Sequence, residues 1–389
     1  MLESRTFVES EEHLHQLACT MTGLQDFGPA TYRAGLKMLL KSLDADTRTT
    51  PMGREVAAGT IVGTLAARLY TQEGWRLHPQ CLRRSIKAPL VITGIPRTGT
   101  TALHKLLSMD PQFQGLERWI ADVPMPRPPR REWDSNPHYQ RTVATLKAFF
   151  DAAPEMRAAH EMVADEVDEC LELMKQEFTT NRFASGWYVP EYDRWFQKQN
   201  EGPSYDRFAN ILRLIGAHDD RTWLLKNPGH IAELNHLFEI FPDARVVHTH
   251  RDPAKALPSL CSVLAMSRRM LEGDAMQPHA IGPRESDYWL GAVTRAATVR
   301  ATRPQQFFDV DHRRFHAQPL VVVRELYEYF GLTLDRDAES AMREWIAANP
   351  PNRLGEHRYT ADQFGLSAAS LHESFRDYMR TFGLDRPAR

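Results

Sequence analysis

The apolar positions in the first part of the chain recur at steps of three and four residues. Leu36, Leu39, Leu40 and Leu43 follow this spacing, and the stretch 56–69 repeats it with Ala, Leu, Ile and Val. Such steps place side chains on one face of a helix. Residues 1 to about 85 are therefore predicted to form an N-terminal helical region that packs on the rest of the chain.

After Pro89 the pattern changes to short apolar runs, the first of which ends in glycine and proline before a helical stretch over 100–107. Short apolar runs bounded in this way are typical of buried strands. Strands that alternate with helices predict an α/β fold, an open parallel sheet flanked by helices with its ligands beyond the carboxyl ends of the strands. The predicted strands are 90–95, 222–225, 245–250 and 306–311.

A long insertion, 118–220, separates the first two predicted strands. Its Trp, Tyr, Phe and Met content is consistent either with an apolar pocket on the acceptor side or with the core of a helical layer. From about residue 318 the pattern is helical again. We therefore divide the chain into 1–85 and an α/β domain over 86–389. Helical stretches within the insertion are expected near 137–152, 161–178, 187–198 and 204–216.

Composition narrows the function. The chain has 389 residues, 42% apolar and 25% charged, with a formal net charge of −2. No overall positive field exists to bind nucleic acid through its phosphates, so we expect no nucleic-acid partner. The four cysteines are scattered, which suits a reducing compartment with free thiols and no structural zinc. We see no targeting segment and no apolar run of the roughly 20 residues that a membrane helix needs, so a cytoplasmic location is expected.

The loop after the first predicted strand has the spacing of a phosphate-binding loop. It reads Gly94-Ile-Pro-Arg-Thr-Gly99-Thr100-Thr101 and lies between a strand and a helix. Glycines let backbone N–H groups turn toward an anion, and the helix N-terminus adds partial positive charge. An oxyanion site is therefore predicted here.

This loop lacks the parts that bind ATP with magnesium. An ATP-binding loop carries Lys where this chain has Thr100, and its nearest cation is Arg97 within the loop. The two later strands run into Lys226 and Arg251, not into an acidic residue that would help to hold magnesium. The loop is thus predicted to bind an anion that arrives without a metal, and we expect no metal site.

The loop resembles the 5′-phosphosulfate-binding loop of sulfotransferases that use 3′-phosphoadenosine 5′-phosphosulfate (PAPS). A second element of that family, a strand followed by Arg and by Ser eight residues later, is matched by Arg251 and Ser259. The match runs from about 89 to about 365 and is nearest to the larger bacterial sulfotransferases. The chain departs from the animal enzymes at Arg97, where they carry Lys, and at Ala102, where they carry an aromatic residue that stacks on adenine.

The resemblance implies a set of nucleotide contacts. Arg97 would bridge the 5′-phosphate and the sulfonate, and Lys226 would lie over the sulfonate and the bridging oxygen. Arg251 and Ser259 would bind the 3′-phosphate, as would a basic segment near the C-terminus. The remaining contacts implied are Thr98, Gly99, Thr100 and Thr101 for the 5′-phosphate, and Arg353 and Arg358 for the 3′-phosphate.

An acceptor hydroxyl also needs a general base. One candidate is His230, four residues after Lys226, and the resemblance implies another, Glu117, which lies about 20 residues after the loop arginine, where some sulfotransferases carry a catalytic glutamate. His160 is a third candidate. The acidic stretch 165–169 is interpreted as the solvated first turn of a helix. His248 and His250 are expected to serve packing or local hydrogen bonding.

The function implied is transfer of the sulfuryl group of PAPS to a hydroxyl, or alternatively an amine, of a small-molecule or lipid-like acceptor, giving PAP as the second product. The alternatives are a degenerate P-loop kinase, which would need magnesium, and a nucleotide-binding protein without catalysis. The sequence identifies neither the acceptor nor the aromatic residue that covers the adenine. A homo-oligomer is possible.

Overall fold

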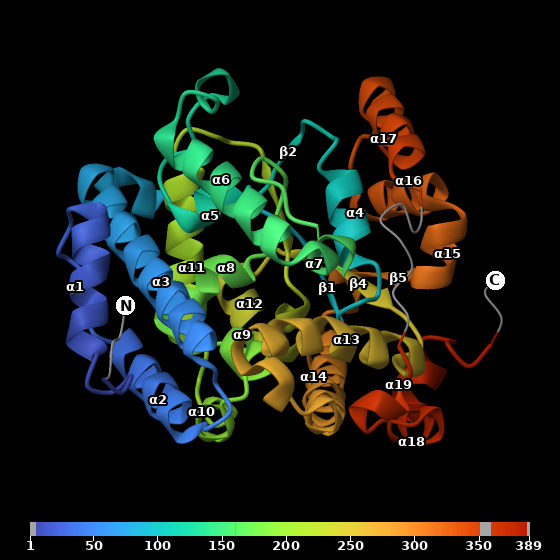
Figure 1. Ribbon diagram of the computed structural model, residues 1–389. Coiled ribbons are helices and arrows are strands. Elements are labelled where there is room, and N and C mark those ends of the chain that lie inside the picture. The colour runs from blue at the N-terminus through green and yellow to red at the C-terminus, as the bar shows by residue number, and fades with distance from the viewer. Residues whose placement is uncertain (1–4, 160, 351–358, 387–389) are drawn as a thin grey trace.

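A five-stranded parallel sheet lies at the centre of the computed structural model, which describes residues 5–159, 161–350 and 359–386 (Figure 1). The strand order is β2-β3-β1-β4-β5, and all neighbouring pairs are parallel. Four strands confirm the predicted runs, whereas β2 has only two residues and gives no apolar run. The strands are β1 (Leu90–Gly94), β2 (Phe113–Gln114), β3 (Thr222–Lys226), β4 (Arg245–His250) and β5 (Phe307–Asp311).

Both faces of the sheet are buried, which explains why its strands are continuously apolar. Val91 faces one core and Leu90 and Ile92 face the other, because successive side chains of a strand point to opposite sides. The smaller core is closed by α4 (Thr100–Leu107) and α15 to α17. The larger core is closed by helices of the insertion together with α12 to α14.

The helices after β3 confirm the predicted alternation. They are α12 (Leu234–Ile240), α13 (Pro253–Glu272), α14 (Ile281–Thr302), α15 (His312–Ala317), α16 (Pro319–Phe330), α17 (Arg336–Ala348), α18 (Ala368–Ser374) and α19 (Arg376–Thr381). Short 3-10 helices join several of these elements, including η4 (Pro228–Ala232) directly after β3. No helix in the described part of the chain has the length and apolar character needed to cross a bilayer.

The predicted N-terminal helices are α1 (Glu11–Thr22), α2 (Tyr32–Ala45) and α3 (Pro51–Leu77). They share an apolar core with Phe178, Phe183 and Trp187 of the insertion. The fully buried Arg68 of α3 adds polar contacts: Nη1 donates to Gln176 O (3.1 Å) and Glu177 Oε1 (2.7 Å). The N-terminal helices are thus fixed to the insertion by apolar packing and by a buried ion pair.

The insertion differs from its prediction in one stretch. A helix was expected near 161–178, but residues 161–170 are irregular and only short helices follow. The irregular stretch lies antiparallel to 116–119, with Trp119 N donating to Ala164 O (3.1 Å) and a bridge between Glu117 and Val167. The helices of the insertion are α5 (Arg118–Asp122), α6 (Pro137–Ala152), α7 (Pro154–Ala159), α8 (Leu171–Met174), η3 (Lys175–Glu177), α9 (Asn181–Gly186), α10 (Pro190–Phe196) and α11 (Gly202–Ile215).

Candidate functional site

The predicted phosphate loop leaves β1 at the carboxyl edge of the sheet. Gly94 has φ +143°, and a Cβ there would lie 2.5 Å from the carbonyl oxygen of Thr249 on β4. Gly99 has φ +93° and precedes the first residue of α4, where no side chain caps the helix. Both positions therefore require glycine, and the first N–H groups of α4 remain available for an anion.

Arg97 joins the two parts of the predicted nucleotide site. Its backbone has φ +69°, a region that non-glycine residues rarely adopt and that is often found at functional sites. Its Nε donates to Ser259 Oγ on α13 (3.1 Å), and its carbonyl oxygen accepts from Arg251 Nη1 (2.9 Å). The structure thus brings Arg97, Arg251 and Ser259 together, although about 160 residues separate the loop from Ser259.

The two guanidinium groups at this site are partly buried. Burial lowers the pKa of Arg97, and the nearby Arg251 adds to that lowering. Burial also lowers the pKa of Arg251. Two close cations that have lost part of their hydration favour the binding of an anion between or beside them. The opposite charge of the anion stabilises the charged guanidinium groups. Tyr359, which ends the polar segment 349–359 near the C-terminus, is close enough to affect both pKa values.

The threonines of the loop divide into two kinds. The Thr98 hydroxyl lies beneath the loop, where it donates to Ile95 O (2.7 Å) and shares a hydrogen bond with Thr249 Oγ1 (2.5 Å). Thr98 therefore supports the loop and offers a ligand only its backbone N–H. Thr101, by contrast, accepts from Lys226 Nζ at 3.3 Å and lies toward the end of β3.

Lys226 is 2% exposed at the carboxyl end of β3, and its partner was not foreseen. Its Nζ lies 2.5 Å from Glu169 Oε1. Glu169 belongs to the acidic stretch 165–169, and the interpretation of that stretch as a solvated helix turn is wrong. It precedes α8 in an irregular segment, and Cys170 N donates to Lys226 O (2.9 Å), which fixes the segment against the strand end.

A second buried acid orients Glu169. Asp168 Oδ1 accepts the backbone N–H of Glu169 (2.7 Å), and Asp168 Oδ2 accepts from Arg118 Nη1 (3.2 Å). The N–H of Asp168 donates to Leu116 O at 2.7 Å. Glu169 is therefore held on both sides by backbone hydrogen bonds. A carboxylate fixed in this way beside a buried ammonium group is arranged in advance for charge or proton transfer.

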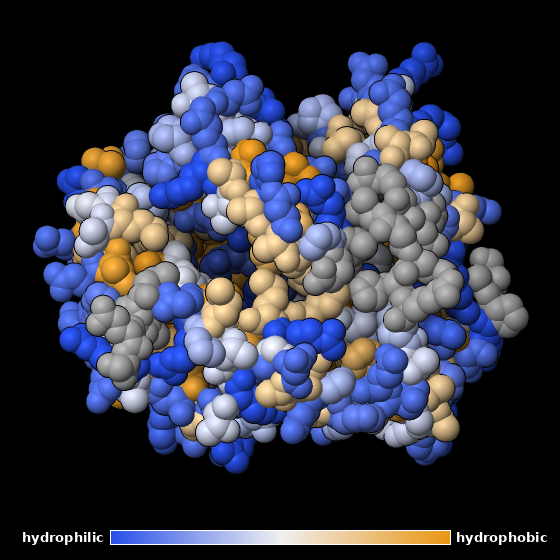
Figure 2. Space-filling view, in the orientation of Figure 1, coloured by the Kyte–Doolittle hydropathy of each residue, from blue (hydrophilic) through white to orange (hydrophobic). Residues whose placement is uncertain are grey.

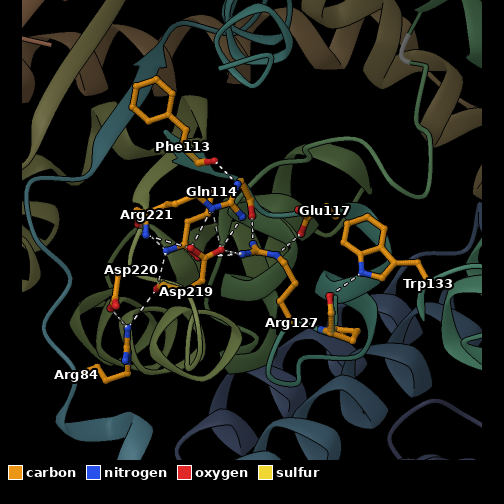
Figure 3. A network of polar contacts seen from close by, with 11 residues as sticks. Arg84, Phe113, Gln114, Glu117, Arg127, Trp133, Asp219, Asp220 and Arg221 are labelled. Carbon is orange, nitrogen blue, oxygen red and sulfur yellow. Dashed lines mark hydrogen bonds and ion pairs between the residues drawn. The ribbon is translucent and has the colours of Figure 1, made fainter. Parts of the chain in front are cut away.

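Glu117 is not placed at this edge of the sheet. Its carboxylate accepts from Arg127 Nε (3.0 Å), and Arg127 Nη1 also donates to Gln114 Oε1 (2.9 Å) and Asp219 Oδ2 (3.1 Å) (Figure 3). Asp219 lies three residues before the start of β3, whereas Lys226 is the last residue of that strand. Glu117 thus belongs to a network that joins β2, the loop before β3 and the insertion, and its geometry does not support a role as base.

His230 is also placed differently from the expectation that it lies at a pocket mouth. It is fully buried on η4, and its Nδ1 shares a 2.8 Å hydrogen bond with Tyr205 Oη on α11. Burial lowers its pKa to about 3. An imidazole enclosed by aromatic side chains and kept neutral in this way packs the core, and its surroundings argue against proton exchange with an acceptor.

Three further histidines, His312, His248 and His250, lie on α15 and β4. His312, at the start of α15, lies next to Gly99, and its pKa falls to about 3 through burial and the nearby Arg251. His248 and His250 pack on β4 as expected, with His250 Nε2 and Asp309 Oδ1 at 2.8 Å. These two with Asp309 form the one group in the described part of the chain that has metal-ligand spacing, but the Arg300 guanidinium bonds both His248 and Asp309. A cation already occupies that position.

Three predicted residues cannot be placed. Arg353, Arg358 and His160 lie outside the described residues. Of the remaining predictions, the loop, Arg251, Ser259 and Lys226 come together at one edge of the sheet, whereas Glu117 and His230 do not join them. A narrow pocket with room for about one water molecule lies beside Thr101 and Lys226. Its lining also includes Lys105, Met162, Glu166 and Asp168.

Comparison with known proteins gives consistent results. A model of the sulfotransferase family matches residues 89–336. Two solved mycobacterial sulfotransferases have the same fold. STF1 from Mycobacterium tuberculosis is 35% identical, with a TM-score of 0.86 over 96% of this chain and 100% of that chain. STF9 from Mycobacterium avium is 26% identical, with a TM-score of 0.90 over the full length of both chains.

A curated relative has a more specific description. It is the omega-hydroxy-beta-dihydromenaquinone-9 sulfotransferase Stf3 of Mycobacterium bovis and Mycobacterium tuberculosis. It is 22% identical over 307 residues, which cover 77% of this chain and 76% of the relative.

Proposed function

This chain belongs to the sulfotransferase family and is a sulfotransferase, and we propose that it moves the sulfuryl group of PAPS to a hydroxyl of a small-molecule or lipid-like acceptor. The observation that carries the proposal is the Lys226–Glu169 pair beside Thr101, at the sheet edge where the phosphate loop begins. The pair places a cation and a base candidate at one point. A kinase would instead need an acidic magnesium ligand at these strand ends.

The residues present fit PAPS. The uncapped N–H groups at the start of α4 suit the 5′-phosphate, and Arg97 adds a planar set of donors. Arg251 and Ser259, already joined through Arg97, suit the 3′-phosphate. PAPS supplies an activated sulfuryl group whose acceptance leaves negative charge on the 5′-phosphate oxygen. Lys226 and Arg97 would stabilise that charge without a metal ion.

Glu169 replaces His230 and Glu117 as the proposed general base. It is the carboxylate in contact with Lys226, and its side chain is 20% exposed, so an acceptor can reach it. In our proposal Glu169 takes the proton of the acceptor hydroxyl while the acceptor oxygen bonds to sulfur. Lys226, which pairs with Glu169, would also supply N–H groups to the departing phosphate oxygen.

The acceptor class is supported by the relative Stf3, whose described substrate carries a hydroxyl on a lipid-like quinone. A hydroxyl acceptor is also what a carboxylate base suits, because an alcohol must lose its proton as it attacks. We therefore place hydroxyl acceptors ahead of amines.

The test measures PAP release from PAPS with farnesol and with 1-dodecanol as acceptor probes. Glu169→Gln is expected to lower kcat roughly 10²- to 10⁴-fold, and Lys226→Ala roughly 10²- to 10³-fold. The matched control is Asp165→Asn in the same acidic stretch, because Asp165 pairs with Arg130 at 3.1 Å instead of with Lys226.

Calorimetry with PAP gives an independent readout of the same proposal. Wild type and all three variants should bind PAP in the presence of EDTA. Tight ATP binding that requires magnesium, with no binding of PAP, would overturn the proposal. Unchanged turnover in Glu169→Gln would show that Glu169 is not the base, but it would not contradict PAPS as the donor.

A further inference from the structure

A small apolar cluster lies apart from the three larger cores of the protein. Phe150, Ala153 and Met156 are buried in it, and Phe149, Met162 and Met266 pack against them. These residues come from α6, α7, the segment after α7 and the middle of α13. We call this group the methionine–phenylalanine cluster. The other aromatic residues of the insertion mostly pack in the larger cores, so the cluster is the part of the insertion whose apolar content the core does not explain.

The cluster reaches the surface. Phe149, Met162 and Met266 are half-buried, and Val143 on the same helix α6 is 43% exposed. Figure 2 shows an apolar strip that runs over α6 and α7 toward α13, beside a hollow in the same face. Methionine side chains are flexible and polarizable and adapt to apolar ligands of different shape. A contiguous apolar strip of this kind marks a binding surface more often than an accident of packing.

The cluster is continuous with the sulfuryl site through one side chain. Met162 packs in the cluster and also lines the narrow pocket beside Thr101 and Lys226. Its Sδ lies 3.8 Å from Nη1 of Arg118, the arginine that holds Asp168. An apolar ligand on the cluster therefore ends next to the pair proposed for catalysis.

We propose that the methionine–phenylalanine cluster binds the apolar chain, alkyl or isoprenoid, of an amphiphilic acceptor whose hydroxyl lies at Glu169. The inference rests on the proposed function and adds to it the chemistry and the place of the acceptor's tail. The members of the cluster are Phe, Met and Ala only, so they offer dispersion and apolar burial and no hydrogen bond for a polar tail.

The charges around the cluster favour a single chain over a membrane surface. On α6, Lys147 pairs with Asp151 (2.6 Å), and α6 and α7 together carry three basic residues (Arg141, Lys147, Arg157) against two acidic ones (Asp151, Glu155), a net charge of +1. Arg157 lies with its guanidinium 4.9 Å from the Phe150 ring centre and covers the cluster from one side. Binding of an anionic bilayer needs an excess of Lys and Arg around the apolar face. The net charge of +1 on α6 and α7 falls short of such an excess.

The experiment measures binding of 1-hexanol, 1-octanol and 1-decanol to the PAP-loaded full chain by calorimetry. Each added methylene should lower Kd by about fourfold while the chain still lies on apolar surface. Met266→Glu and Phe149→Glu are each expected to remove most of this dependence on chain length. Met266→Leu should keep it. The matched control is Met52→Glu, because Met52 is 70% exposed and lies at the start of α3, far along the chain from the cluster.

Binding of PAP by each variant separates the possible failures. If wild type does not bind PAP, the proposed function fails. Two results with normal PAP binding would show that the assignment of the cluster is wrong. One is that the Kd of the alcohol does not change from 1-hexanol to 1-decanol. The other is that Met266→Glu and Phe149→Glu both bind 1-decanol as well as wild type. Flotation with vesicles of anionic phospholipid is the last arm. If wild type binds these vesicles but not the alcohols, and both Glu variants lose vesicle binding, the cluster binds a membrane instead of an acceptor chain. That result would overturn the inference.

Discussion

Arg97 Nε donates to Ser259 Oγ at 3.1 Å, so the turn after β1 and the helix after β4 are joined directly at the carboxyl edge of the sheet. The two residues were assigned by resemblance to opposite ends of the nucleotide, the 5′- and 3′-phosphates. Their contact means that one guanidinium group can influence both ends.

Loss of the Ser259 hydroxyl should weaken nucleotide binding. A hydrogen bond to a charged group contributes about 1.5–3 kcal/mol, so Ser259→Ala is expected to raise the Kd of PAP roughly tenfold or more. Calorimetric titration with PAP measures this. Ser267→Ala on the same helix is the matched control, because its hydroxyl bonds Gly186 O (3.4 Å) in the insertion. Equal PAP affinity in both variants would contradict the assignment of Ser259.

Asp168 is expected to act as a positioning residue for Glu169. Asp168→Asn loses the ion pair with Arg118 and weakens the hold on the Glu169 backbone. Misplacement of a catalytic group by a fraction of an ångström lowers kcat by roughly 10- to 100-fold. The Kd of PAP should change little, because the hydrogen bonds of Asp168 described above join Leu116, Arg118 and Glu169. Steady-state kinetics with farnesol and PAPS give kcat, and a rise in the Kd of PAP without loss of kcat would refute the role.

Gly99 should tolerate no side chain. Its φ of +93° is strained for alanine, and the new Cβ would lie 3.4 Å from His312 Cδ2. Gly99→Ala is therefore expected to lower the free energy of unfolding by about 1–3 kcal/mol and to weaken PAP binding. Urea unfolding measures the first effect. The control is Gly63→Ala in the middle of α3, where a Cβ meets nothing within 4 Å and the expected change is a gain of about 0.5–1 kcal/mol.

His230 should make the protein sensitive to acid. Burial lowers its pKa from 6.5 to about 3 in the folded chain. The unfolded chain takes up this proton first, so the contribution of the neutral imidazole is complete above about pH 6.5 and is lost as the pH falls from there toward 3. The free energy of unfolding should therefore fall by up to about 1.4 kcal/mol for each pH unit in this range, for one histidine.

Urea unfolding of wild type and His230→Gln at several pH values between about 7.5 and 4.5 tests this expectation. In His230→Gln the free energy of unfolding should change less steeply with pH, because one titrating group has been removed. Tyr205→Phe removes the 2.8 Å hydrogen bond to His230 but keeps the imidazole, so it should keep the slope. The same slope in wild type and His230→Gln would show that His230 does not titrate in this range.

The sequence predicted the parts of this protein that short-range patterns encode. The strands at 90–95, 222–225 and 245–250 were found because buried parallel strands are continuously apolar. The loop from Gly94 to Thr101 was found because its backbone geometry requires glycines at this spacing. Lys226 was found because it ends such a strand. These features depend on neighbours within a few residues.

The proposed base was missed because it is defined by a contact between distant residues. Glu169 and Lys226 are 57 residues apart, and nothing local separates Glu169 from the other acids of 165–169. Glu117 and His230 matched the spacing expected of a base, but Arg127 and Tyr205 bind them elsewhere. The short strand β2 was missed for a similar reason, because two residues pair only where β3 is already in place.

The buried Arg68 connects the first eighty residues to the segment that carries the proposed base. It bonds Gln176 and Glu177, which follow α8, and α8 begins two residues after Glu169. Helix α3 lies before residue 89, where the family match begins. Substitutions in that leading helix are therefore expected to shift the segment that carries the proposed base, and a shortened protein that begins at β1 would lack the contacts that hold this segment.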